Sequence, residues 1–478
     1  MAPIDSLSRR RAALALLCAV NFMVILDSQI VILAIPSIET DLGLSASSAQ
    51  WIVSGYLLSF GGLLLLGGRA GDLLGRRRVF MAGVALFGVS SLACALAPSA
   101  GVLVAARIVQ GVSAAIMAPT ALAILMTTFA EGRKRNTALA FYGGVGGLGA
   151  TAALLIGGLL TDLFGWQAVF LLNLPVAAAL FALAPVLLDE SRNTQTESGY
   201  DPAGALSITA SLGLLIYAVV GAPAAGWASA RTLGLLAAGV VLLAAFVVIE
   251  ARGSAPLVPL RVVRSRTLVA GNLVMLLAAM CAFGMSFILS RYAQEVLSLS
   301  PIEFGLGTAA MTIGTLVGSF AAQRLVARTG LWPIAAVSFV LLGAGLLLLS
   351  GVSPDGSYAA DLLPGLLVFG PGLGAGTVVG SIAALTGVEG ADAGVASGTN
   401  TGAFQIGGAI GTAIVAAVAA THARDAAALT DGFGRAFLTA VVFAVVGLVV
   451  AVVLLRRRRQ ASTNAATPGD EAKLPASS

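Results

Sequence analysis

The side chain with the clearest potential for chemistry is a single carboxylate, Asp27, which lies deep within an apolar stretch near the start of the chain. A carboxylate inside a bilayer costs about 2.5–3.5 kcal/mol on insertion scales, so it requires a partner, water or a proton. The candidate partner is Arg107, because both residues lie roughly 10–12 Å from the outer ends of their helices at a rise of ~1.5 Å per residue. This matching depth predicts a pair between two antiparallel helices.

Such a pair has two interpretations. Burial disfavours a charged carboxylate and a nearby guanidinium favours it, so the balance can change when access alternates between the two membrane faces. Asp27 would then take up a proton outside and release it inside, and each inward proton gains about 2.3 kcal/mol per 100 mV of membrane potential. The other interpretation is a static ion pair between Asp27 and Arg107 that only fixes helix packing.

Uncharged polar and aromatic side chains within the spans are candidates for contact with a substrate. Polar amides either line a cavity or hydrogen-bond between helices, and aromatic faces suit apolar or cationic compounds. The predicted substrate-contacting residues are Asn21, Phe22, Tyr56, Gln110, Phe141, Asn400 and Gln405. Gln110 also shares a helix face with Arg107, because it follows three residues later. Arg291, near the outer end of its span, is expected to extend to the membrane interface.

The elements that position these residues are transmembrane helices. The chain has 478 residues, of which 58% are hydrophobic and only 10% are charged, too few charges to cover a soluble protein of this length. Apolar runs of roughly 18–25 residues separated by short polar loops indicate an all-α polytopic membrane protein with about fourteen spans. The predicted spans are 12–35, 48–67, 79–97, 101–128, 137–160, 166–188, 203–221, 231–250, 267–290, 302–322, 331–350, 358–385, 395–420 and 433–455.

The segment 68–80, between the second and third spans, sets the predicted orientation. It contains one acid and four arginines, namely Asp72, Arg69, Arg76, Arg77 and Arg78. The positive-inside rule places this segment, and with it both ends of the chain, in the cytoplasm. An acid at the end of one helix and arginines at the start of the next predict a charge latch that favours the outward-facing state and breaks on switching. The alternative is that these arginines only determine topology.

The span pattern predicts four regions. They are a six-helix bundle at 1–188, linkers with two inserted spans at 189–266, a second six-helix bundle at 267–455, and a disordered cytoplasmic tail at 456–478. The segment 318–330 resembles a degenerate copy of 68–80, and internal repetition is typical of secondary transporters. The glycines of the fifth span, among them Gly146, Gly149, Gly157 and Gly158, predict close helix approach, either for gating or for generic packing.

Several function classes are excluded. The charges flank the spans and form no stripe on a soluble face, which argues against nucleic-acid binding despite a net charge of +5. Cys18, Cys94 and Cys281 fall in predicted spans without metal-ligand spacing and are predicted to be packing residues. A phosphate-binding loop is missing, so the chain alone cannot pump with ATP. The single histidine, His422, leaves no catalytic set for a hydrolase. We expect no metal or cofactor, and the proton gradient as energy source.

The chain resembles the major facilitator superfamily, specifically its fourteen-span drug:proton antiporters, over nearly its whole length and with three motifs in the correct order. Gly68, Asp72, Gly75, Arg76 and Arg77 match the loop signature of the superfamily, and Leu26-Asp27-Ser28 through Ala34-Ile35-Pro36 resembles its first-span motif. Arg107 to Gly111 resembles the fourth-span motif, and Gly165-Trp166-Gln167 through Asn173-Leu174-Pro175 resembles the start of the sixth span. The fifth-span motif usually ends Gly-Pro-x-x-Gly-Gly, whereas residues 153–158 read Ala-Leu-Leu-Ile-Gly-Gly.

The resemblance implies the major facilitator fold, two six-helix bundles plus two extra helices, with Asp27 and Arg107 in proton coupling. We therefore predict proton-coupled efflux of hydrophobic or amphipathic small molecules, such as antibiotics or toxic metabolites, by a monomer in the cell membrane. Few acids in the second half favour neutral, anionic or monocationic substrates over dications. One alternative is a substrate-specific exporter or nutrient importer of the same fold. Another is a non-transporting membrane sensor, in which Asp27→Asn would leave the phenotype intact.

Overall fold

The computed structural model describes residues 6–129, 133–191, 201–253, 265–388, 393–420 and 426–456, and all regular elements among them are helices. Helices are expected here, because a backbone surrounded by lipid must satisfy its N–H and C=O groups within its own segment. The all-α fold predicted from the apolar runs is confirmed.

The helices fall into an N-terminal bundle, an inserted pair and a C-terminal bundle. The N-terminal bundle contains α1 (Ser6–Leu42), α2 (Ala46–Leu74), α3 (Arg76–Ala95), α4 (Ala100–Thr128), α5 (Arg133–Phe164), α6 (Gln167–Leu171) and α7 (Asn173–Leu187). The inserted pair is α8 (Pro202–Ala225) and α9 (Ala230–Arg252). The C-terminal bundle contains α11 (Arg266–Arg291), α12 (Pro301–Gly307), α13 (Ala309–Thr329), α14 (Leu331–Leu349), α15 (Leu363–Leu385), α16 (Ala393–Ala420) and α17 (Ala426–Val450), with π-helical turns η1 (Tyr292–Val296), η2 (Tyr358–Leu362) and η4 (Ala451–Leu455).

Thirteen helical segments of the described residues are long and apolar enough to cross a membrane, and α5, with a shorter apolar stretch at Leu155–Phe164, occupies the place of the remaining predicted span. The helices extend beyond the predicted apolar runs, because charged residues at their ends remain helical. The first helix, for example, covers Ser6–Leu42 rather than 12–35, and Pro36 does not end it.

The predicted cationic loop at 68–80 is almost entirely helical. Only Gly75 separates α2 from α3, and its φ of +108° lies in a region that side-chain-bearing residues rarely adopt. In the C-terminal bundle Gly330 separates α13 from α14 in the same way, with a φ of +85°. The supposed loop at 318–330 is therefore also helix up to its last residue. The two bundles share a single-glycine turn at corresponding places, which supports the internal repeat.

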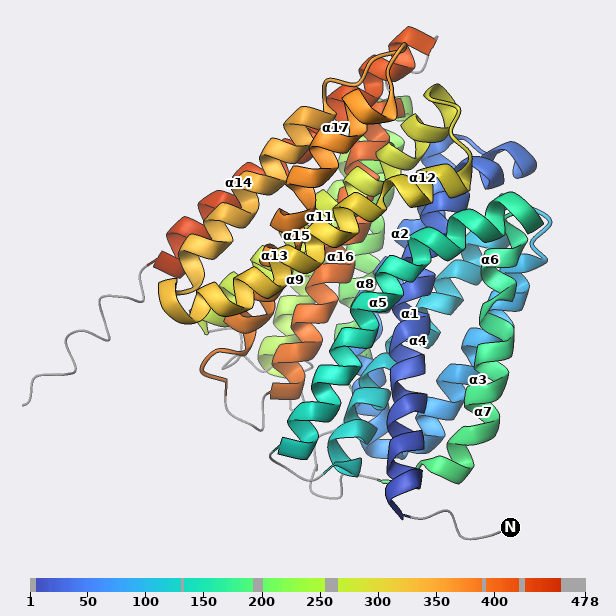
Figure 1. Ribbon diagram of the computed structural model, residues 1–478, viewed down its shortest axis with the longest axis vertical. Helices are drawn as coiled ribbons and strands as arrows, with labels where there is room; N and C mark the ends of the chain where they lie inside the picture. Colours follow the sequence, from blue (N-terminus) through green and yellow to red (C-terminus); the bar gives the residue numbers. More distant parts are fainter. Residues whose placement is uncertain are drawn as a thin grey trace, which may run out of the picture.

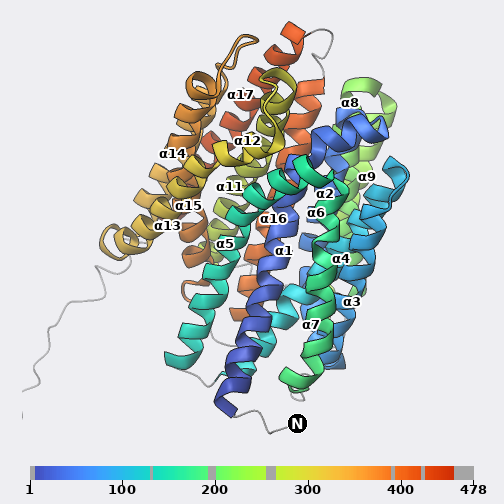
Figure 2. The same cartoon turned by 45° about the vertical axis from the view of Figure 1, so that its right-hand side comes forward.

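The two bundles touch at one end and along one pair of helices between the ends. Figure 1 and Figure 2 show them meeting around α12 and diverging toward the end at which the N-terminus lies. We call the end at which the N-terminus lies, where the turns at Gly75 and Gly330 are found, the loop end. The opposite end is the far end. At the far end α1 contacts α11, and α5 contacts α12 so closely that a methyl group on Gly158 would overlap the Pro301 carbonyl. Between the ends, α2 packs along α16.

The inserted pair packs on the outside of this arrangement. Helix α8 contacts both α2 and α16, and Thr209 of α8 sits against Gly62 of α2 so closely that a side chain on Gly62 would clash. Helix α9 pairs with α8 and is exposed along most of its length. The pair therefore covers one side of the α2–α16 contact.

Candidate functional site

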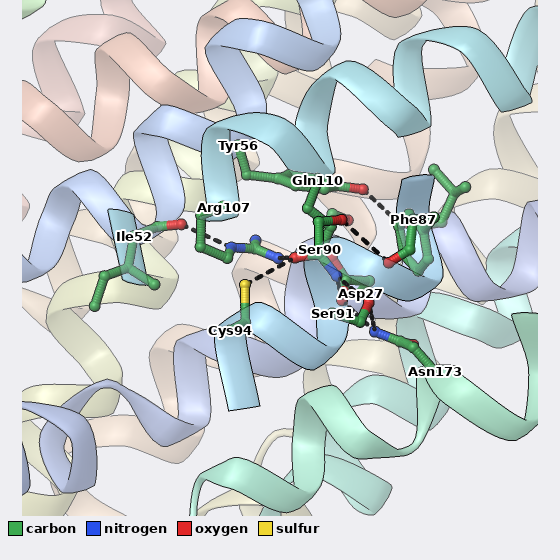
Figure 3. A network of polar contacts seen from close by, with 12 residues as sticks. Asp27, Ile52, Tyr56, Phe87, Ser90, Ser91, Cys94, Arg107, Gln110 and Asn173 are labelled. Atoms are coloured by element: carbon green, nitrogen blue, oxygen red, sulfur yellow. Dashed lines mark hydrogen bonds and ion pairs between the residues drawn. The ribbon is translucent and has the colours of Figure 1, made fainter. Parts of the chain in front are cut away.

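Asp27 and Arg107 form an ion pair inside the N-terminal bundle, where α1 faces α4 (Figure 3). The Arg107 Nη1 atom donates to the Asp27 Oδ2 atom at 2.7 Å, and neither side chain has any exposed surface. Solvent does not screen such a pair, so each charge depends on the other for its stability. The predicted pairing at matching depth is therefore present in the fold.

Two amide side chains complete the surroundings of the carboxylate. Gln110 on α4 donates from Nε2 to Asp27 Oδ1 at 3.0 Å, and Asn173 donates from Nδ2 to the same oxygen at 2.7 Å. Gln110 also accepts from Arg107 Nη1 at 2.7 Å and donates to Ser91 Oγ on α3 at 2.7 Å. The carboxylate thus accepts three hydrogen bonds from donors on α4 and α7 (Figure 3).

Asn173 and Ser91 were not among the predicted site residues. Asn173 is the first residue of α7 and is only 1% exposed, and the short helix α6 precedes it in the same span. Its sequence signal was available, since a buried amide in an apolar span requires hydrogen-bond partners. The sequence could not identify the partner, because the contact joins residues 146 positions apart.

Contacts other than the ion pair with Asp27 also hold Arg107 in place. Its Nε atom donates to the Ile52 carbonyl at 3.0 Å, and its guanidinium carbon lies 4.1 Å from the centre of the Tyr56 ring. A cation over an aromatic face gains electrostatic attraction from the ring. Only its Nη2 atom has no hydrogen-bond partner among the described residues. Arg107 therefore has a fixed position and one nitrogen able to take a further acceptor.

A carboxylate can accept about four hydrogen bonds, two at each oxygen. Asp27 accepts two at Oδ1 and one at Oδ2, so one position, at Oδ2, has no donor from these side chains. Because the donors lie on α4 and α7 and the acceptor on α1, a movement of these helices, or of the side chains of Gln110, Arg107 or Asn173, changes the number of hydrogen bonds that Asp27 accepts.

The loop-end residues predicted as a latch form a second polar network. Arg76 donates from Nη2 and Nε to Asp72 Oδ1 at 2.7 and 2.9 Å, which joins α3 to α2 across the Gly75 turn. Glu190, which follows α7, accepts from the backbone N–H of Arg77 at 3.1 Å, so its carboxylate caps the first turn of α3. Gly68 lies one turn before Asp72, against Pro119 of α4. These bonds all lie within the N-terminal half of the chain.

The prediction that Arg291 extends to the membrane interface is wrong. Its side chain is 10% exposed and contacts two acids, Glu39 of α1 at 3.3 Å and Glu295 at 2.8 Å. The arginine stays inside because a carboxylate from the opposite bundle reaches it, and such a contact is invisible in the span pattern.

Two of the predicted substrate-contacting residues belong to the Asp27 network instead. Tyr56 is fully buried and donates from its hydroxyl to the Val24 carbonyl at 3.3 Å, and the Arg107 guanidinium lies over its ring. Gln110 is likewise fully buried and binds Asp27. Both therefore lie within the N-terminal bundle, where other side chains, rather than a substrate, occupy their polar and aromatic surfaces.

The other predicted substrate-contacting residues are spread over both bundles. Asn21 donates to the Tyr142 carbonyl at 2.8 Å and so joins α1 to α5. Asn400 donates to Asn272 Oδ1 at 3.1 Å within the C-terminal bundle. Phe22 is half-buried and Phe141 is 59% exposed, whereas Gln405 is buried where α16 meets Gly61 of α2. The predicted positions on α1, α5 and α16 thus remain candidates for contact with a substrate.

The fifth-span glycines do bring helices together. A Cβ on Gly149 would lie 2.9 Å from the Phe22 carbonyl oxygen of α1, and one on Gly157 would lie 2.7 Å from the side chain of Ile30. Such spacing leaves no room for a methyl group beside a neighbouring backbone. Gly146 lies in α5 at a position whose surroundings the structure does not describe. Within the described part of the chain the three cysteines are buried and free, and there is no group of three potential metal ligands.

The chain is similar to known transporters along nearly its whole length. Residues 17–412 match the model of the Major Facilitator Superfamily. The puromycin resistance protein of Streptomyces alboniger is 37% identical over 457 residues, covering 93% of this chain and 90% of that protein. The cephamycin export protein of Amycolatopsis lactamdurans is 36% identical over 458 residues, covering 94% and 93% respectively.

Solved structures agree with this fold. A peptide transporter crystallised with sulfate superposes with a TM-score of 0.67 at 18% identity, covering 95% of this chain and 99% of that chain. The nucleoside transporter NupG gives a TM-score of 0.65 at 13% identity, covering 92% and 99%. The predicted multi-pass protein of the cell membrane is therefore confirmed. The chain belongs to the major facilitator superfamily, and it is a membrane transporter rather than an enzyme.

Proposed function

We propose that this chain exports hydrophobic or amphipathic antibiotics from the cell in exchange for protons, with Asp27 as the proton carrier. The observation that carries the proposal is the fully buried Asp27 carboxylate, paired with Arg107 and closed in by two amides. The names of its relatives, which include resistance and export proteins for puromycin, tetracenomycin C and cephamycin, support an antibiotic as the substrate.

The orientation follows from charge. Basic side chains concentrate at the loop end. They lie at the starts of α1 and α3, at the end of α9 and directly after η4, and the positive-inside rule assigns that end to the cytoplasm. Acids such as Glu39, Asp41 and Asp355 lie at the far end, which is then the outer face. Both chain ends are cytoplasmic in this orientation, and the bundles diverge toward the cytoplasm (Figure 2).

The coupling step follows from the hydrogen bonds of Asp27. When the bundles open outward, one donor withdraws and water delivers a proton to the carboxylate. When they open inward, Arg107, Gln110 and Asn173 close on Asp27 as in this structure, which favours the charged form and expels the proton to the cytoplasm. Each inward proton supplies about 2.3 kcal/mol per 100 mV of membrane potential.

The residues predicted as a latch have a different part in this cycle, because the Asp72–Arg76 bonds are formed although the bundles diverge at the loop end. The Asp72–Arg76 bonds and the Glu190 cap hold α2, α3 and the end of α7 together, so that the N-terminal bundle moves as one body. The drug site lies between the bundles near the midplane, as in other transporters of this construction. One chain suffices for transport, and the proton gradient replaces any cofactor.

The test uses the full-length protein in proteoliposomes with an imposed proton gradient and labelled puromycin as the probe. We expect wild type to accumulate puromycin against its gradient and to move protons in the opposite direction, and Asp27→Asn to lose both activities. Asp355→Asn, an equal charge change at an exposed position, is the matched control and should transport normally.

Two results would contradict the proposal. Protons moving in the same direction as the drug would identify an importer that uses symport. Undiminished uphill transport by Asp27→Asn, or after an ionophore has collapsed the gradient, would rule out coupling through this carboxylate.

A further inference from the structure

A group of contacts at the far end joins the two bundles and takes no part in the Asp27 site. It begins with Pro36 inside α1. Proline has no N–H group, so the carbonyl of Ile32, four residues earlier, lacks its donor within the helix. In a membrane span such a carbonyl must find a donor on a neighbouring element.

The donors come from the opposite bundle. Ser290 of α11 donates its hydroxyl to the Ile32 carbonyl at 3.0 Å, and Gln294 of η1 donates from Nε2 to the Leu33 carbonyl at 3.1 Å. Gln294 also donates to Ser290 Oγ at 2.9 Å, so the hydroxyl is oriented toward Ile32. The backbone defect in one bundle is therefore satisfied by side chains of the other.

An ion pair lies beside these hydrogen bonds. Arg291 of α11 contacts Glu39 of α1 through Nη2 and Oε2 at 3.3 Å, while its Nε donates to Glu295 at 2.8 Å. The side chains of Arg291 and Glu39 are only 10% and 11% exposed. Glu39 Oε1 has no hydrogen-bond partner among the described residues, so Arg291 is the partner that the structure gives this carboxylate.

We propose that Glu39, Ser290, Arg291 and Gln294 are positioning residues of the transport cycle, which hold the far end closed and release it in every turnover. We call these four residues, with the Ile32 and Leu33 carbonyls, the far-end clasp. Its contacts cross between bundles, so they must break when the far end opens. Water can then reach the carbonyls and the carboxylate, which keeps the opening reversible. The role assigned here assumes the alternating access of the proposed function.

The test measures the distance between the bundles at the far end. The full-length protein carries alanine at Cys18, Cys94 and Cys281, and spin labels at Leu96→Cys and Asp355→Cys, which are exposed positions following α3 and α14. Pulsed electron paramagnetic resonance in lipid nanodiscs then gives the ratio of closed to open far ends. No substrate is needed.

We expect Glu39→Gln and the double variant Ser290→Ala/Gln294→Leu to lengthen the distance. In the double variant the closed-to-open ratio should fall about fivefold for each hydrogen bond lost between the bundles. Asp431→Asn is the matched control, because Asp431 pairs with Arg435 at 2.9 Å inside the single helix α17. Its distance distribution should equal that of the parent. Unchanged distributions in the clasp variants, or an equal shift in the control, would overturn the proposal.

Pro36→Ala provides an independent test. Alanine restores an N–H group that can bind the Ile32 carbonyl within α1, so Ser290 becomes less necessary. Ser290→Ala should then change the ratio less in the Pro36→Ala background than in the parent, which is a coupling that a double-mutant cycle detects. Equal effects in both backgrounds would refute the link between the proline and the clasp.

The two proposals fail in different ways. Suppose that the clasp variants open the far end, but that neither the parent nor any variant moves protons in exchange for the drug. The antiport proposal is then wrong and the clasp proposal stands. If proton-coupled export is demonstrated but substitutions of Glu39, Ser290 and Gln294 leave the spin-label distances unchanged, only the clasp proposal is wrong.

Discussion

Asp27→Asn should destabilise the protein, and adding Arg107→Gln should restore much of the loss. The single substitution keeps an oxygen that accepts from Gln110 and Asn173, so those two bonds can persist. It removes the anion that Arg107 contacts at 2.7 Å, at a place where neither side chain is exposed. The arginine is then a buried charge without compensation.

The magnitude follows from this loss. Removing one partner of a buried pair costs about 3–5 kcal/mol. The double variant is uncharged at this place, but it loses the Arg107 bond to the Ile52 carbonyl and the contact with Tyr56, each worth about 1 kcal/mol. The double variant should therefore be more stable than Asp27→Asn by about 1–3 kcal/mol, while remaining less stable than wild type.

The assay is reversible unfolding in mixed micelles, in which the denaturing detergent is varied and helix content is followed. Uphill puromycin export is measured in parallel on the same preparations. Neither variant should drive export, although their stabilities differ. This combination separates a carboxylate needed for coupling from one needed only for packing.

Two outcomes would refute the reasoning. If Asp27→Asn is as stable as wild type, the carboxyl group was already neutral and the ion pair does not exist. If the double variant is less stable than the single one, the guanidinium contributes mainly by packing rather than through its charge.

Three further predictions concern the surroundings of the Asp27 site and the cap of α3. Asn173→Leu removes one donor to Asp27 at a cost of about 1–3 kcal/mol and should change the pH dependence of export, which transport at a series of pH values would reveal. Gly111→Ala should destabilise by about 1–3 kcal/mol in the same unfolding assay, because its methyl group would overlap the backbone of α2. Glu190→Gln should weaken the cap of α3 by about 1 kcal/mol and accelerate amide exchange over its first turn.

Each of these predictions has a matched comparison. Asn21→Leu removes an amide that binds the Tyr142 carbonyl, and it should leave the pH profile unchanged. Gly101→Ala lies in the same helix as Gly111 with no atom within 4 Å of its Cβ position, so its stability should be unaffected. Asp189→Asn, adjacent to Glu190 but 83% exposed, should not alter exchange in α3. An effect equal to that of the site variant would contradict the corresponding prediction.

Much of the fold could be predicted because each membrane-spanning helix can be recognised from the length and hydropathy of its own segment. An apolar run must satisfy its backbone internally, so length and hydropathy alone gave the number and order of spans. The helix ends were less accurate, since Arg76 and the residues up to Leu74 are as helical as the apolar runs that flank them. The turn itself depends on the positive φ of Gly75, and the sequence signals it only as a glycine among charged residues.

The sequence by itself determined that Asp27 needs a partner and that Arg107 lies at the same depth, because helical rise converts residue number into distance along the membrane normal. Only the tertiary structure decided that Asn173 also binds this carboxylate and that Ser91 binds Gln110. It alone decided that the Tyr56 ring supports Arg107 and that Arg291 binds Glu39 across the bundles. Depth is a property of one helix, whereas these contacts depend on which helices are neighbours and how each is rotated about its axis. Packing between helices sets both, and that information is distributed over the whole chain.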